Sequence, residues 1–162
     1  MRGRPVLLIV FLFSVLAVAA QDAPKASVLL LMDHSYSLRI AEHGVRRHVL
    51  LQTAVRRLVA DSSGVEWAVL SFDDIGSVRL EQPFTTNTGR TVRSLGKADL
   101  GRLSPVGQAI GWAAAYLVKN AASEERSVVL VSDGVSTDGY RFLPTLGTGV
   151  LASGVTLHIL GV

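Results

Sequence analysis

The stretch S-V-L-L-L-M-D-H-S-Y-S, from Ser27 to Ser37, decides the fold expected for this chain. Its first half is an uninterrupted apolar run of the length expected for a strand buried on both faces of a sheet. Its second half changes abruptly to an acid and two hydroxyls at alternate positions, Asp33, Ser35 and Ser37. Open α/β sheets bind ligands beyond the carboxyl ends of their strands. The stretch therefore predicts a central strand that ends in oxygen ligands.

The rest of the chain supplies the other strands of such a sheet. Apolar runs at Ser127–Ser132 and Val155–Val162 predict two more buried strands. Val65–Phe72 predicts another, which a turn joins to an antiparallel partner at Ser77–Phe84. Because helical patterns separate the apolar runs, we expect an α/β protein. The predicted architecture is a doubly wound, mostly parallel sheet with one antiparallel edge hairpin.

Four helices are expected between these strands. The first runs from about Val45 to Ala60, and its predicted apolar face consists of Leu51, Val55, Leu58 and Val59. A short helix is expected around Gly89–Leu95, and Gly139–Leu151 predicts a short or irregular one. The remaining helix ends near Asn120, with Ser104 as its expected N-cap and Pro105 at its first helical position. Its predicted buried stripe is Val106, Ile110, Ala113, Ala114 and Leu117.

The N-terminus has the pattern of a secretory signal peptide. Two arginines precede an uncharged run from Pro5 to Ala20, which closes on small residues. We therefore divide the chain into a signal peptide at 1–20, a short lead at 21–26 and one domain at 27–162. This predicts a secreted or periplasmic protein, with a membrane association only if the segment stays as an uncleaved anchor. The run is short for a bilayer span, which needs about 20 residues.

Charge and cysteine content exclude some classes of function. Removing Arg2 and Arg4 from the 16 basic residues leaves 14, against 13 acidic ones. Without a basic block interleaved with aromatic residues, the sequence does not predict a nucleic-acid partner. Cysteine is absent, so the domain is expected to fold without disulfides, which a core of this size permits.

Oxygen-bearing side chains follow three of the predicted elements. Besides Asp33, Ser35 and Ser37, these are Ser104 at a helix start and Asp133 after a strand. Parallel strands would bring all three loops to one edge of the sheet. Two carboxylates with several hydroxyls, and no His or Cys, suit Mg²⁺, with Mn²⁺ or Ca²⁺ as alternatives, and disfavour Zn²⁺.

These motifs resemble the von Willebrand factor A domain and its metal-ion-dependent adhesion site. D-H-S-Y-S, L-S-P-V-G-Q-A-I and V-L-V-S-D-G occur in the family's order and approximate spacing, and the resemblance covers Ser27 to Val162. It implies a Rossmann-like fold in which Ser35 and Ser37 ligate a metal through their hydroxyls. Asp33 and Asp133 would hold the metal directly or through water, and Ser104 stands where the family usually has threonine.

The chain also departs from the family pattern in two places. Tyr36 stands where many members have glycine, and it could be a residue that contacts a partner. Members typically continue after the last strand with a further strand and a closing helix. This chain is therefore expected to lack both elements, as either a fragment or a trimmed domain.

The resemblance predicts an exported, non-enzymatic adhesion or docking module. Its partner would be a protein that presents an Asp or Glu carboxylate to the metal. One alternative is a Mg²⁺-dependent phosphoryl hydrolase that uses Asp33, although the usual second aspartate two positions later is Ser35 here. Another is a metal-free structural domain within a larger assembly, in which these residues serve only as turn and capping groups. We predict no catalytic residues. The side chains of adjacent residues point in different directions, so Asp33, His34 and Ser35 are not expected to form a triad. No G-x-S-x-G motif is present either.

Overall fold

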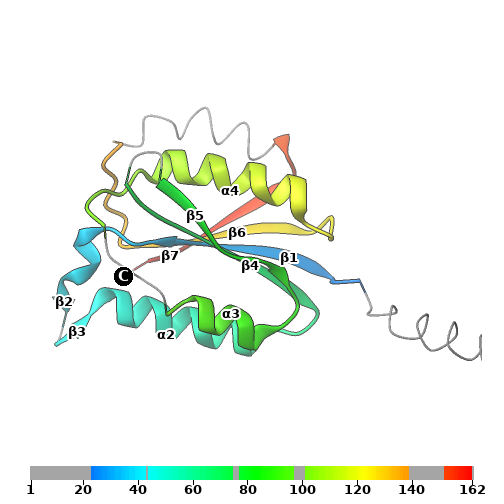
Figure 1. The fold of residues 1–162 in the computed structure, drawn as a ribbon, viewed down its shortest axis with the longest axis horizontal. Helices are drawn as coiled ribbons and strands as arrows, with labels where there is room; N and C mark the ends of the chain where they lie inside the picture. The colour runs from blue at the N-terminus through cyan, green and yellow to red at the C-terminus, as the bar shows by residue number, and fades with distance from the viewer. Residues whose placement is uncertain (1–22, 43, 75–76, 97–100, 139–151, 162) are drawn as a thin grey trace, which may run out of the picture.

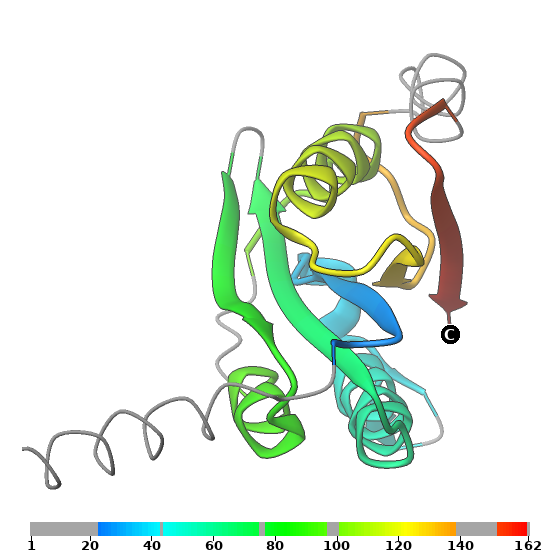
Figure 2. The same ribbon diagram turned by 90° about the vertical axis from the view of Figure 1, so that its right-hand side faces the viewer.

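A five-stranded sheet forms the centre of the computed structural model, which describes residues 23–42, 44–74, 77–96, 101–138 and 152–161. The strand order is β5-β4-β1-β6-β7, and β5 and β7 form the two edges (Figures 1 and 2). The strands are β1 (Ala26–Asp33), β4 (Val65–Asp74), β5 (Ser77–Thr85), β6 (Arg126–Ser132) and β7 (Val155–Gly161). Four are parallel, and β5 pairs antiparallel with β4. The predicted fold class is confirmed.

Helices cover both faces of the sheet. The helix α4 (Val106–Asn120) lies on one face, and α2 (Arg47–Ala60) and α3 (Thr88–Ser94) lie on the other (Figure 1). Alternate residues of β1 face opposite sides: Leu29 and Leu31 pack in the core layer beneath α4, and Leu30 and Met32 pack in the layer beneath α2. The predicted buried stripe of α4 is confirmed at every position: Val106, Ile110, Ala113, Ala114 and Leu117.

The start of α2 differs from the prediction. The helix begins at Arg47, because the two residues before it (β3, Val45–Arg46) pair with β2 (Ala41–Glu42) in a short hairpin. Gly44 lies in that turn with φ of +82°, a backbone conformation that favours glycine. Val45 and Arg46 are therefore extended and do not belong to the helix.

The apolar face of α2 also differs at one residue. Leu51, Val55 and Val59 are buried, but Leu58 is 42% exposed. Leu58 lines an open groove of about 430 Å³ beside β7 instead of packing under a covering element. The predicted signal peptide and the predicted helix at 139–151 lie outside the described residues. Among the helices that the structure does describe, none has the length and apolarity needed to cross a bilayer.

The central position of β1 places its end among loops from other elements. Asp33 is the last residue of β1 and lies in register with Phe72 of β4. On the other side, Met32 is in register with Val131, so the end of β6 lies beside Asp33. The carboxyl edge of the sheet is therefore where the predicted site residues meet.

Candidate metal site

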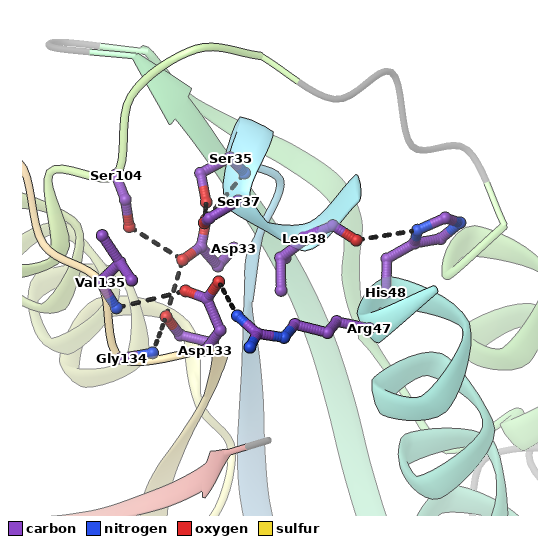
Figure 3. A network of polar contacts seen from close by, with 11 residues as sticks. Asp33, Ser35, Ser37, Leu38, Arg47, His48, Ser104, Asp133, Gly134 and Val135 are labelled. Carbon is purple, nitrogen blue, oxygen red and sulfur yellow. Dashed lines mark hydrogen bonds and ion pairs between the residues drawn. The ribbon is translucent and has the colours of Figure 1, made fainter. Parts of the chain in front are cut away.

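Asp33 is the centre of a buried hydrogen-bond network. Asp33 is 2% exposed. Its Oδ1 accepts a hydrogen bond from the Ser35 backbone N–H at 2.8 Å. Its Oδ2 accepts a hydrogen bond from Ser104 Oγ at 2.8 Å (Figure 3). The same Oδ2 accepts another from Ser132 Oγ at 2.7 Å. Both carboxylate oxygens are thereby fixed by groups from three separate segments of the chain: the loop after β1, the loop before α4 and the end of β6.

The surroundings of Asp33 also act on its charge. Burial raises the pKa of the Asp33 carboxyl above its ordinary value, while the hydrogen bonds from Ser132, Ser35 and Ser104 act in the opposite direction. Burial is the larger effect. The folded domain therefore favours the protonated form of this acid more than water does.

Ser35 and Ser37 lie side by side next to this carboxylate. Their Oγ atoms are 3.0 Å apart, and Ser35 is 3% exposed. A 3-10 turn at Tyr36–Arg39 (η1) gives the loop its tight curvature. Tyr36, which replaces the glycine of many family members, is 60% exposed, with the Arg39 guanidinium 5.3 Å from its ring centroid. The tyrosine thus lies on the surface next to the two serines and leaves their hydroxyls beside Asp33.

Ser104 does not cap α4 as predicted. The N-cap residue is Pro105, the helix begins at Val106, and the Ser104 hydroxyl is turned to Asp33. Asp138, which is distant in sequence, caps the helix instead. Its Oδ2 accepts hydrogen bonds from the backbone N–H groups of Gly107 at 2.8 Å and Gln108 at 3.3 Å. The cap from another loop leaves the serine hydroxyl available to the site.

Thr137 fastens Ser104 in place. The Ser104 N–H donates to Thr137 Oγ1 at 3.0 Å, and the Thr137 N–H donates to the Ser104 carbonyl at 2.9 Å. The loop after β6 is thereby tied to the start of α4, so the Ser104 hydroxyl and the end of β6 are positioned together.

Asp133 contributes the second carboxylate. Its side chain is fully buried, and its Oδ1 accepts a hydrogen bond from the Val135 N–H at 3.2 Å. Gly134 between them has φ of +78°, and its N–H donates to Ser132 Oγ at 3.1 Å. The other oxygen, Oδ2, is 3.4 Å from Nη1 of Arg47, the first residue of α2 (Figure 3).

The structure brings all five predicted site residues to one place: Asp33, Ser35, Ser37, Ser104 and Asp133. Two carboxylates and three hydroxyls form a donor set of hard oxygens only, which fits Mg²⁺ or Mn²⁺. Within the described residues no cluster of three or more His, Cys, Asp or Glu side chains offers a metal site. An arginine already lies against one carboxylate, which shows that this position accommodates positive charge.

Sequence reasoning missed three residues of this site: Ser132, Arg47 and Asp138. Ser132 belongs to the V-L-V-S-D-G motif and could have been found from its place at the strand end. Arg47 and Asp138 carried no such signal, since one lies in a run of helix arginines and the other lies in a polar loop. His34 is buried beside Asp33, and burial lowers its pKa. Its Nδ1 has no hydrogen-bond partner among the described residues.

The fold is that of a von Willebrand type A domain. Residues 28–135 match the von Willebrand factor type A domain family, which is two thirds of the chain. The chain therefore belongs to that family. No curated protein sequence matches it significantly.

Several solved structures share the fold at low sequence identity. BatB from Bacteroides thetaiotaomicron is 18% identical over 84% of this chain and 66% of that one, with a TM-score of 0.69. The SpRpn10 VWA domain is 13% identical over 83% of this chain and 73% of that one, also with a TM-score of 0.69. The vWF domain of the type V pili tip protein Mfa5 from Porphyromonas gingivalis is 16% identical over 70% of this chain and 39% of that one, with a TM-score of 0.56. The chain thus spans only about two thirds of the BatB chain and a smaller part of the pilus protein.

Proposed function

We propose that this protein is an exported module that binds a protein partner through a divalent metal ion. The observation that carries the proposal is the convergence of Asp33, Asp133 and three serine hydroxyls at the carboxyl edge of the sheet. Asp33, Ser35, Ser37, Ser104 and Asp133 would hold the ion, either directly or through water. Mg²⁺ is the metal best suited to these ligands, and Mn²⁺ and Ca²⁺ are also oxygen-seeking cations.

The charges of the site support docking of an acidic group. Two carboxylates balance a divalent cation, and neutral hydroxyls add no further negative charge, so a bound ion would keep its attraction for another anion. A glutamate or aspartate of a partner protein is such an anion. Binding of this kind requires the metal and is lost when a chelator removes it.

Two features support binding over catalysis. Among the described residues, the hydroxyls of Ser104 and Ser132 donate to Asp33, and His34 has an unpartnered Nδ1. No serine of the site is paired with a base in the manner of a nucleophile. Asp33 itself is held on both oxygens by hydrogen bonds, which suits a ligand-positioning role more than attack on a phosphoryl group.

Export is the part of the proposal that rests on the N-terminus and on the kind of proteins that share the fold. The signal-like pattern at 1–20 predicts it. The proteins that share the fold include a type V pili tip protein and an aerotolerance-related membrane protein from Bacteroides fragilis.

Thermal unfolding with and without metal tests the proposed site. A ligand that binds only the native state, at about 100 times its Kd, adds about 2.7 kcal/mol to the free energy of unfolding. This corresponds to a rise in Tm of a few degrees for a domain of this size. We expect Mg²⁺ or Mn²⁺ to produce that rise over EDTA in the wild type and not in Asp33→Asn. Equal melting temperatures of the folded wild type in EDTA and in either metal would contradict the proposal.

A further inference from the structure

Arg47 places a fixed positive charge against the candidate metal site. Its Nη1 lies 3.4 Å from Asp133 Oδ2, while the Asp133 side chain is fully buried and the Arg47 side chain is 25% exposed (Figure 3). Asp133 is thus a buried carboxylate whose second oxygen faces a guanidinium. An arginine stays charged at every pH at which the protein is folded, so this contact cannot be switched off by loss of a proton.

The position of Arg47 in its own helix favours contact with an anion. It is the first residue of α2, and the first turn of that helix contains no acidic residue. The N-terminus of a helix carries a partial positive charge that repels cations. The interaction with Asp133 offsets this repulsion.

The contact is also one that can be broken. Charge-assisted N–H···O hydrogen bonds are normally about 2.7–2.9 Å long, and this one is 3.4 Å. Because the side chain is partly exposed, the guanidinium has a route to solvent that leaves the helix backbone in place. These properties distinguish it from a tightly locked structural ion pair.

We infer that Arg47 is a tethered counter-cation of Asp133 which competes with the divalent metal and so sets the metal affinity of the site. Without metal, the guanidinium neutralises the buried carboxylate. When metal binds, Asp133 Oδ2 exchanges the guanidinium for the ion or its bound water, and the arginine turns toward solvent. This inference rests on the proposed metal site, and it adds an internal competitor to it.

Mn²⁺ titration of Arg47→Gln against the matched variant Arg46→Gln tests the inference. Arg46 is the preceding, exposed residue, so both variants lose one positive charge from the same end of α2. We expect Arg47→Gln to bind Mn²⁺ about tenfold more tightly than wild type, a difference of about 1.4 kcal/mol. Arg46→Gln should stay within about twofold of wild type, since an exposed charge is largely screened. Calorimetry of Mn²⁺ binding gives these affinities.

Melting in EDTA provides a second measurement that does not depend on bound metal. Arg47→Gln should melt below Arg46→Gln in EDTA, because it leaves a buried carboxylate without a counter-charge. Addition of Mn²⁺ should raise the Tm of Arg47→Gln by more than it raises the Tm of Arg46→Gln. Arg47→Lys, which keeps the charge, should bind Mn²⁺ with an affinity close to that of the wild type. It is the variant to measure if Arg47→Gln does not fold.

The outcomes separate this inference from the proposed function. Equal Mn²⁺ affinities of wild type, Arg46→Gln and Arg47→Gln would overturn the role of Arg47 and leave the metal site standing. Absence of Mn²⁺ binding from all of the folded variants would overturn both.

Discussion

Ser132 Oγ donates a hydrogen bond to Asp33 Oδ2 at 2.7 Å, which joins the end of β6 to the end of β1. The same hydroxyl oxygen accepts the N–H of Gly134 at 3.1 Å. Ser132 is 1% exposed and Asp33 is 2% exposed, so the Asp33 carboxylate cannot replace this hydrogen bond with one from bulk water. This one side chain therefore holds both Asp33 and the turn that carries Asp133.

Ser132→Ala should weaken the metal site without removing a metal ligand. We expect a loss of about 1–3 kcal/mol in the free energy of unfolding, because the buried Asp33 carboxylate loses a hydrogen-bond donor. Mn²⁺ affinity should fall about tenfold or more, as found for groups that orient metal ligands. Urea denaturation and calorimetry measure the two effects. Ser127→Ala, nearer the start of the same strand, should leave the affinity unchanged, and an equal loss in both variants would contradict this role for Ser132.

Gly134, in the turn after β6, can be tested against Gly154 as a matched control. Both have positive φ, +78° and +68°, and a Cβ at either meets no atom within 4 Å. Alanine at either position should therefore cost about 1 kcal/mol from backbone strain alone. Gly154 lies before β7 at the opposite end of the sheet from the site. Only Gly134→Ala should reduce Mn²⁺ affinity, and unchanged affinity in that variant would show that the turn does not position Asp133.

Asp138→Ala should expose the start of α4. The Gly107 and Gln108 N–H groups would lose their acceptor, at a cost of about 1 kcal/mol, as for other lost helix caps. Hydrogen exchange at these two amides should accelerate more than exchange in the middle of the helix. Asp61→Ala removes only an exposed i,i+4 pair with Arg57 and should change stability by a few tenths of a kcal/mol. If the two variants are equally stable, Asp138 does not cap α4.

The metal-free stability of the domain should depend on pH through Asp33. Because burial raises the pKa of the Asp33 carboxyl, the folded state binds its proton more tightly than the unfolded state does. The contribution of this residue to the free energy of unfolding therefore falls as pH rises from about 3.8 through the folded pKa. Asp33→Asn has no such proton, so in EDTA it should become more stable relative to wild type as pH rises through this window. Urea denaturation of both proteins as a function of pH measures the difference; a constant difference would contradict the raised pKa.

The strands and most of the site could be predicted because their signals are local. The apolar runs that become β1 and β6 end directly in Asp33 and Asp133, and the parallel arrangement then brings the two acids together. The start of α2 could not be predicted, since two-residue strands such as β2 and β3 have no periodicity to detect. Ser104 was placed wrongly as a cap because a serine before a proline is a common helix start.

The contacts of Arg47 and Asp138 depend on tertiary structure alone. Arg47 pairs with a residue 86 positions away, and Asp138 caps a helix that begins about 30 residues earlier. From the sequence, an arginine in an R-R pair on a helix is most simply a solvated residue. The exposure of Leu58 has the same origin, because helical periodicity does not reveal whether another element covers the end of the stripe.

Direct titration with Mn²⁺, followed by electron paramagnetic resonance, tests the central claim most directly. The free ion gives a signal that decreases on binding, so the titration counts the sites. We predict about one Mn²⁺ per chain, displaced by Mg²⁺ and removed by EDTA, and little or no binding by Asp33→Asn or by Asp133→Asn. If the folded wild type binds no Mn²⁺, or if both variants bind it as well as the wild type does, the metal site proposed here does not exist.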